Sequence, residues 1–556
     1  MNLITCRPKR PASGCLPFIA SVCLAISLWG CSFPARANVY PTNLRLNGGT
    51  TNATLAYGGA AAIGYLLNEP ATAGVAVHIK SGATTIRTLT LAGGGPGTAR
   101  GTNSVTWNGR DNASNTVPAG AYTIHVTTAA NGHGDWTQIS NDLDPGRYVY
   151  EPRGIAVNQN SNSLYYGRVF VGNATNGPNY LFDPGDMVGI QKLNADGSYA
   201  DEGGFSDGGW PWAGDYFSPW KIEVSADDYV YVNDWTGNGI VLRFDQTLSP
   251  ASQLVVLRDD NWPNSGTANL SGPFITGTGA NTKVWMADIN VSPGGVGIRR
   301  WSVNGSGIVE TNDLGATIVQ NGGGSHLNVY PYDVAVDRSN RIYTIQFRVN
   351  SGDVSYRVLR FPAYNESGTA QTNADWRIGT ADDSMRGAFG VAVNPVGSYL
   401  AVAFRGAGTS PNRVGCSVKV FSTDDGSLVT TQTPAANHDH TDVAWDNVGN
   451  LYVLDNFASV WRVYSPPGSN AATTIAPMTV QVAPPPAPPT LTAPGYSAGQ
   501  FQFTLNGQAN VTYVIEASTN LSDWSPVTTN TSASAIRPIA VSAPNVRSYY
   551  RAKLAP

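Results

Sequence analysis

Short apolar runs separated by polar breaks recur along most of the chain. One copy, "DVAWDNVGNLYVLDN" at 442–456, has an apolar run, a break that contains Gly449, and a second apolar run that ends at Asp455. Five other stretches share this pattern and begin at Gly154, Lys221, Phe274, Asp333 and Gly390. The six copies start at intervals of roughly 50 to 70 residues, a period that indicates a propeller or a solenoid.

Most copies continue with a third run, such as "RVLRFPAY" or "VWRVYSP", and a weaker fourth. Four antiparallel strands per repeat form a propeller blade. The first run of a copy is apolar on both faces, as at Val334 and Val336, which is expected where blades pack face to face. The pattern predicts a six-bladed β-propeller over 151–482. The repeat, a Gly or Asp before an apolar run with Ala and Val, resembles NHL-type and gluconolactonase-like six-bladed propellers.

The segment 38–130 contains short strands between turn residues, the spacing of a β-sandwich. Its stretch "VTWNGRDNASNTVPAGAYTIHV" resembles the Ig-like domain of flagellar hook-capping proteins. Trp107 and Tyr122 are predicted core anchors, and the resemblance implies a spacer or assembly module rather than a catalyst. Residues 131–150 are predicted to connect this domain to the propeller.

The prolines of 483–495 predict an extended linker, and the alternating runs of 496–556 predict a second small β-sandwich. The motifs "IEASTNLSDW" and "YYRAKL" resemble the fibronectin type III-like C-terminal domain of secreted proteins from verrucomicrobial-type bacteria. The predicted fold class is therefore all-β, a six-bladed β-propeller flanked by two small β-sandwich domains.

The first 37 residues have the pattern of a signal peptide. A basic start precedes the apolar stretch "CLPFIASVCLAISLWG", and "ARA" at 35–37 supplies a small-residue cleavage site, so the mature chain is expected to begin at Asn38. The apolar stretch is too short for a membrane span, and no transmembrane helix is predicted in the mature chain. We expect a secreted or cell-surface protein, with the periplasm and a lipoprotein anchored through Cys31 as alternatives.

The charge of the chain argues against one class of partner, and its cysteine content argues against disulfides. The segment 1–37 holds four of the 34 Lys and Arg residues and none of the 38 acidic residues, so the mature chain has a formal net charge of −8. This charge argues against nucleic acid as a partner. Only Cys416 remains in the mature chain, so no disulfide framework is expected.

Propellers place ligands in a central funnel, where the inner strands begin and the second strands end. The residues just ahead of the inner strands include Arg153, Trp220, Tyr332 and Phe389. The second strands end at Asp234, Asp288 and Asp455. These three carboxylates could hold Ca²⁺ or another divalent cation, whereas the alternative is that they cap turns. No other cofactor is predicted.

Histidines offer a second candidate metal site. His438 and His440 form an H-x-H pair, which points both rings to one side of a strand, and His326 could approach the same face. Amidating-lyase relatives of the NHL propellers carry histidines ahead of several inner strands, where this chain has other residues. The alternative is that all three are solvated loop histidines.

The insertion "DEGGFSDGGWPWAGDYFSPW" at 201–220 brings Trp210, Trp212 and Trp220 between the first two blades. Aromatic loops at a propeller face can stack on sugars or apolar ligands. The alternative is that these tryptophans pack the insertion against its neighbours.

Three functions fit these features. The leading hypothesis is an exported binding protein whose propeller recognises a carbohydrate, small-molecule or protein ligand, with an extracellular ligand or a cell-surface protein or polysaccharide as partner. The alternative is a metal-dependent hydrolase or lyase of the lactonase type. A structural cell-surface component is the third hypothesis.

Overall fold

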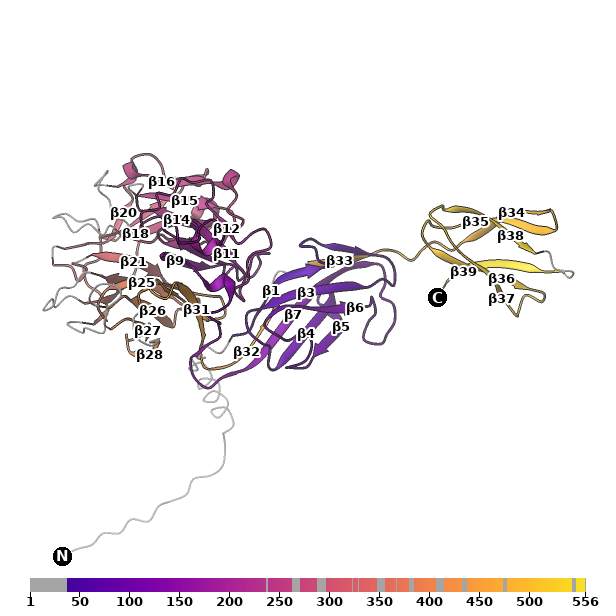
Figure 1. The fold of residues 1–556 in the computed structure, drawn as a ribbon, viewed down its shortest axis with the longest axis horizontal. Coiled ribbons are helices and arrows are strands. Elements are labelled where there is room, and N and C mark those ends of the chain that lie inside the picture. The colour runs from indigo at the N-terminus through magenta and orange to yellow at the C-terminus, as the bar shows by residue number, and fades with distance from the viewer. Residues whose placement is uncertain are drawn as a thin grey trace, which may run out of the picture.

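The computed structural model describes residues 38–555 apart from 237–238, 263–270, 288–296, 323, 329, 348–355, 367, 380–384, 407–414, 433–437, 474–477 and 543–546. Figure 1 shows three bodies in a row, with a propeller at one end, a sandwich in the middle and a second sandwich at the other end. The predicted signal segment 1–37 lies outside the described residues. Within the described ranges, no helix is long and apolar enough to cross a bilayer.

Six four-stranded antiparallel sheets form the propeller within the described residues. Their inner strands contact one another in a closed circle, which makes each sheet one blade. From the axis outward, blade 1 contains β9 (Pro152–Val157), β10 (Val169–Asn173), β11 (Gly189–Leu193) and β12 (Phe205–Ser206), and blade 2 contains β13 (Ile222–Val224), β14 (Val230–Asp234), β15 (Ile240–Phe244) and β16 (Leu254–Leu257). Blade 3 contains β17 (Phe274–Thr276), β18 (Lys283–Ala287), β19 (Ile298–Ser302) and β20 (Ala316–Val319), and blade 4 contains β21 (Pro331–Val336), β22 (Arg341–Gln346), β23 (Val358–Ala363) and β24 (Trp376–Ile378). Blade 5 contains β25 (Ala388–Val393), β26 (Tyr399–Phe404), β27 (Ser417–Ser422) and β28 (Leu428–Gln432), and blade 6 contains β29 (His440–Trp445), β30 (Leu451–Asp455), β31 (Val460–Ser465) and β8 (Thr137–Gln138). The predicted fold class is confirmed.

The last blade closes the ring with a strand from the other end of the propeller sequence. β8 pairs with β31, so the outer strand of blade 6 precedes blade 1 in the chain. The prediction that 131–150 is only a connector was therefore wrong. Joining the first and last segments in one sheet ties the ring shut without a disulfide.

The Gly and Asp that open the repeats alternate for a steric reason. Asp442 Oδ2 accepts a hydrogen bond from the backbone N–H of Ile155 in the next blade, at 2.9 Å. Asp333 Oδ2 accepts one from Val391 of its next blade at 3.0 Å. A Cβ on Gly390 would lie 2.6 Å from Asp442 Oδ1, so this close approach of blades requires a glycine. The repeat motif thus encodes contacts between blades.

The middle sandwich is built from both sides of the propeller sequence. Its strands are β1 (Pro41–Leu46), β2 (Ala53–Leu55), β3 (Ala61–Leu67), β4 (Gly74–Ser81), β5 (Thr84–Leu91), β6 (Gly101–Trp107), β7 (Gly120–His133), β32 (Gly468–Thr473) and β33 (Met478–Val482). One sheet has the order β1-β3-β6, and the other has β2-β33-β7-β4-β5 with β32 also paired to β7. The predicted propeller boundary at 482 was wrong, because β32 and β33 belong to this sandwich. The propeller is an insertion into the Ig-like domain.

The core of the middle sandwich matches the sequence prediction. Trp107 and Tyr122 are buried and pack edge to face with ring centroids 5.7 Å apart. Trp107 Nε1 donates a hydrogen bond to the carbonyl of Arg110 at 2.9 Å. The hydroxyl of Tyr122 donates one to the carbonyl of Pro118 at 2.7 Å. Each aromatic ring therefore fixes one of the two turns of the motif.

The last body is a separate sandwich of two three-stranded sheets, with the orders β34-β35-β38 and β37-β36-β39. Its strands are β34 (Thr490–Ser497), β35 (Gln500–Asn506), β36 (Thr512–Ser518), β37 (Ser525–Thr531), β38 (Ile536–Ser542) and β39 (Tyr549–Leu554). β34 begins inside the predicted linker 483–495, so the linker is shorter than predicted. Figure 1 shows the chain leaving β33 at the far end of the middle sandwich to reach this body.

Candidate functional site

Three of the residues predicted to line the funnel, Trp220, Tyr332 and Phe389, pack against one another around the propeller axis. Trp220 and Phe389 are each only 2% exposed, and their ring centroids lie 5.4 Å apart. Tyr332 packs 5.0 Å from Phe389. We call Trp220, Trp235, Tyr332, Phe347 and Phe389 the aromatic layer. The repeat pattern gives the place of Trp220, Tyr332 and Phe389 at the starts of inner strands, but not the burial of Trp220 and Phe389.

Sequence reasoning missed two members of the aromatic layer. The ring of Trp235 lies 4.2 Å from that of Trp220, and Phe347 lies 4.4 Å from Tyr332. Both residues directly follow second strands, β14 and β22, one position after the strand ends at Asp234 and Gln346. An aromatic residue one position past two second strands was the signal that could have revealed them.

The tryptophans of the 201–220 insertion anchor it to the blades. Trp210 Nε1 donates to Asp234 Oδ2 at 2.7 Å, and Trp212 Nε1 donates to the carbonyl of Asp207 at 2.9 Å. Both side chains pack against the apolar core of the first two blades. Tyr216 and Phe217 of the same insertion are instead 51% and 46% exposed. The insertion therefore presents aromatic side chains other than the predicted ones.

A loop of blade 1 that contacts the insertion also carries exposed apolar side chains. The loop between β10 and β11 carries Tyr180, Leu181 and Phe182, which are 43%, 71% and 89% exposed. It contacts the insertion through Thr175 Oγ1, which donates to the carbonyl of Gly214 at 3.2 Å. We call Tyr180, Leu181, Phe182, Tyr216 and Phe217 the exposed aromatic face.

Arg153 forms a hydrogen bond with the backbone of the insertion. Its Nε donates to the carbonyl of Tyr216 at 2.8 Å, and its guanidinium contacts Glu151 Oε2 at 3.1 Å. Burial lowers the pKa of Arg153 to about 10, and the nearby Arg405 contributes to the decrease. Arg153 is 7% exposed, so its role in this structure is to fix the backbone that carries the exposed rings.

Asp234 is engaged by the insertion and by its own strand end. Its carboxylate accepts hydrogen bonds from Trp210 Nε1 at 2.7 Å, Ser218 Oγ at 2.5 Å and Thr236 Oγ1 at 2.7 Å. Asp288, the second predicted metal ligand, lies outside the described residues. All three of these donors are side chains, so Asp234 joins the insertion to the end of β14.

Asp455 lies in an ion-pair network at the end of β30. It contacts His438 Nδ1, and Arg462 donates to its Oδ2 at 2.7 Å. Burial opposes ionisation of Asp455, but the hydrogen bonds from His438 and Arg462 outweigh it and lower its pKa below the usual value. Within the described ranges, no three His, Cys, Asp or Glu side chains are grouped so that they could hold a metal ion.

His440 is fully buried beside this network. Its ring stacks on that of His438 with centroids 5.7 Å apart. Neither ring nitrogen makes a well-formed hydrogen bond to the described residues, although the carbonyl of Leu454 is close enough to favour the protonated ring. Burial lowers the pKa of His440 to about 4, so the ring is neutral at physiological pH. His326 is placed elsewhere, against Ala374 and Arg377.

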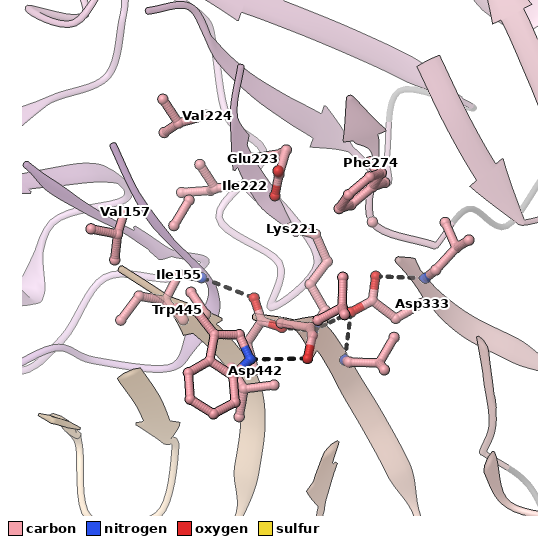
Figure 2. Close-up of a pocket in the computed structure, with 18 of the residues that line it drawn as sticks. Ile155, Val157, Lys221, Ile222, Glu223, Val224, Phe274, Asp333, Asp442 and Trp445 are labelled. Carbon is pink, nitrogen blue, oxygen red and sulfur yellow. Dashed lines mark hydrogen bonds and ion pairs between the residues drawn. The ribbon is translucent and has the colours of Figure 1, made fainter. Parts of the chain in front are cut away.

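An ion pair that sequence reasoning did not single out lies next to the aromatic layer, with Lys221 Nζ 5.4 Å from the centroid of the Phe389 ring. Figure 2 shows Lys221 beside Asp442 and Asp333. Lys221 Nζ lies 2.5 Å from Asp442 Oδ1 and 3.7 Å from Asp333 Oδ2, and it donates to the carbonyl of Thr441 at 2.8 Å. The ammonium thus connects blades 2, 4 and 6. Polar residues inside otherwise apolar inner strands were the available signal.

A cavity of about 180 Å³ extends from this ion pair along the axis, away from the aromatic layer. It is lined by inner strands and by residues that follow them, including Gln159, Arg338 and Asn394. Glu223 also lines it (Figure 2). Burial raises the pKa of Glu223 well above its usual value, and Asp333 and Asp442 add to the increase. The hollow part of the propeller is therefore opposite the predicted funnel.

Comparisons with known proteins identify one of the three bodies. Residues 49–132 match the model of the FlgD Ig-like domain. The match confirms the resemblance to hook-capping proteins for this segment. No curated protein matches the chain.

Several solved structures are similar to the chain. An iodide structure of the Trichoderma reesei carbohydrate-active enzyme family AA12 is 14% identical with a TM-score of 0.38, covering 63% of this chain and 98% of that chain. A glucose dehydrogenase is 11% identical with a TM-score of 0.33, covering 59% and 98%. The soluble aldose sugar dehydrogenase from Escherichia coli in the apo-form is 12% identical with a TM-score of 0.34, covering 62% and 99%. At such TM-scores these likenesses establish no shared activity, and the blade count rests on strand pairing.

Proposed function

We propose that this chain is an exported binding protein whose propeller recognises a carbohydrate, or another ligand with flat apolar surfaces, outside the cytoplasm. The observation that carries the proposal is the exposed aromatic face. Exposed apolar side chains gathered at one site are typical of a binding surface, and the two loops that carry these five are joined by the hydrogen bond from Thr175 to Gly214.

The rings of this face are held on a fixed backbone. Arg153 holds the carbonyl of Tyr216, and Asp234 holds Trp210 and Ser218 on either side of the exposed pair. Phe217 also packs 5.7 Å from Trp235 of the aromatic layer. Ordering the binding residues in advance reduces the entropy lost when a ligand binds, which favours recognition.

The lactonase-like or lyase alternative gains no support from the described aspartates. The carboxylates of Asp234 and Asp455 both accept hydrogen bonds from neighbouring segments of the chain. The finer family assignments, NHL-type for the propeller and fibronectin type III-like for the last sandwich, stay proposals based on sequence motifs. A secreted or cell-surface location is likewise a proposal, as is a cell-surface protein or polysaccharide as partner.

The test is a carbohydrate array probed with the mature protein, followed by calorimetry on the captured sugars. Tyr216→Ala and Phe217→Ala should each weaken binding by about 1 to 3 kcal/mol, the scale of one lost stacking contact. Tyr496→Ala is the matched control, because this tyrosine is 69% exposed on the C-terminal sandwich. Equal affinity in wild type and both face variants would contradict the proposal, as would equal weakening by the control.

A further inference from the structure

The mature N-terminus predicted from the sequence lies at a buried junction between the middle sandwich and the propeller. Asn38 is 2% exposed, and its carbonyl accepts hydrogen bonds from Asn68 Nδ2 at 3.0 Å and from Asn450 Nδ2 at 2.9 Å. Asn68 follows β3 of the sandwich, whereas Asn450 precedes β30 of the propeller. Asn38, the first residue after the predicted cleavage site, thus connects the two bodies.

Two acceptors converge on the backbone nitrogen of Asn38. Glu69 Oε1 and Ser465 Oγ each lie 3.2 Å from it. A peptide N–H has one hydrogen and can satisfy only one of them well, whereas an α-ammonium has three. The arrangement suits a free chain end better than a peptide bond.

Glu69 lacks a buried cation of its own. The residue is 4% exposed, and the one ionisable group paired with it among the described residues is His133, whose side chain is 29% exposed and lies 3.1 Å from Oε2. Burial raises the pKa of Glu69, and the contacts with His133, Asn38 and Ser465 offset this only in part. A buried carboxylate is stabilised when a full positive charge is placed beside it.

We propose that the Ala37–Asn38 peptide bond is a processing site and that the α-ammonium freed on Asn38 forms a buried ion pair with Glu69 that locks the sandwich to the propeller. Hydrolysis adds one water, leaving a carboxylate on Ala37 and the ammonium on Asn38. Because Asn38 is 2% exposed in the folded protein, a peptidase reaches the bond more readily before Asn38 docks than afterwards. Export would then be coupled to the final stability of the fold.

The test uses four forms of the full mature chain. Two begin at Asn38, released from a fusion that leaves no extra residue, and two carry an added Gly-Ser; each pair contains Glu69 and Glu69→Gln. The extension should lower the midpoint of thermal unfolding by several degrees and speed hydrogen exchange at Val39 and Tyr40. Glu69→Gln should lower the midpoint in the Asn38 form and have little effect in the extended form.

Glu366→Gln is the matched control, because Glu366 pairs with Arg300 while its side chain is 71% exposed. It should have the same small effect with either N-terminus. Equal midpoints for the two N-termini, or an equal effect of Glu69→Gln in both, would overturn the ion pair. A mass spectrum of the exported protein should show a chain that begins at Asn38, and a chain lipidated at Cys31 would overturn the processing site.

Discussion

Replacing Lys221 with Met is expected to destabilise the propeller strongly and in a pH-dependent way. Lys221 is 2% exposed, and its ammonium compensates Asp442 at 2.5 Å and Asp333 at 3.7 Å. Met has a similar volume, so the substitution removes the charge with little loss of packing. The variant would leave Asp442 buried without its cation.

The magnitude follows from the protonation that the variant needs. Burial raises the pKa of Asp333 to about 7 despite Lys221, so this carboxyl is already partly protonated in the wild type at neutral pH. Asp442 would have to take up a proton as well, which costs about 4 kcal/mol at pH 7 and about 1.5 kcal/mol at pH 5 for a group with an ordinary aspartate pKa. A carboxyl whose pKa is higher in the folded than in the unfolded state does not destabilise the protein below its unfolded pKa, and the free energy of unfolding falls as the pH rises above that value. The deficit of the variant should therefore shrink on acidification.

Urea unfolding followed by tryptophan fluorescence measures this deficit at both pH values. Lys283→Met is the control, because the ammonium of Lys283 donates to Ser302 Oγ at an exposed position. It should change the free energy of unfolding by less than about 1 kcal/mol. A deficit below 1 kcal/mol for Lys221→Met, or one that does not change between pH 7 and pH 5, would refute the reasoning.

Three further predictions concern other parts of the chain. Burial lowers the pKa of His440 to about 4, so protonation of the unfolded chain destabilises the fold as the pH falls from about 6.5 towards 4. From pH 8 to pH 5, the free energy of unfolding measured with urea should therefore fall by about 2 kcal/mol less in His440→Leu than in the wild type. Val480→Asp should unfold the middle sandwich, by about 3 kcal/mol or more, because Val480 is 0% exposed in its core, while hydrogen exchange shows the propeller strands still protected. A reducing agent should leave the calorimetric melting temperature unchanged, because the sequence 38–556 contains one cysteine, Cys416, which cannot form a disulfide within the chain. A decrease would reveal an intermolecular disulfide.

The repeat made the propeller predictable because each blade is local in sequence. The inner strand, its hairpin and the next strand all lie within one repeat, so one pattern gives the blade count. β8 has two residues and no pattern of its own, and its place beside β31 depends on ring closure. β33 could be recognised as a strand in the sequence. The residues near it, however, contain no pattern that predicts its pairing with β2 and β7, from which more than 300 residues of propeller separate it.

The candidate site was predictable in position but not in burial. The repeats placed Trp220, Tyr332 and Phe389 around the axis, and the structure has all three there. Whether such rings line a funnel or close it depends on Trp235 and Phe347, which pack against Tyr332 and Phe389 of neighbouring or facing blades. The same limit applies to Asp234, whose partner Trp210 lies in a loop with no repeat to align it.

The measurement that tests the binding account most directly compares ligand affinity and turnover of the mature protein before and after treatment with EDTA. The account predicts that affinity stays the same after chelation, that no lactone is hydrolysed in either state, and that Phe217→Ala weakens binding in both. A divalent ion coordinated by Asp234 and Asp455, with lactone hydrolysis lost when that ion is removed, would contradict the account and establish the enzyme alternative.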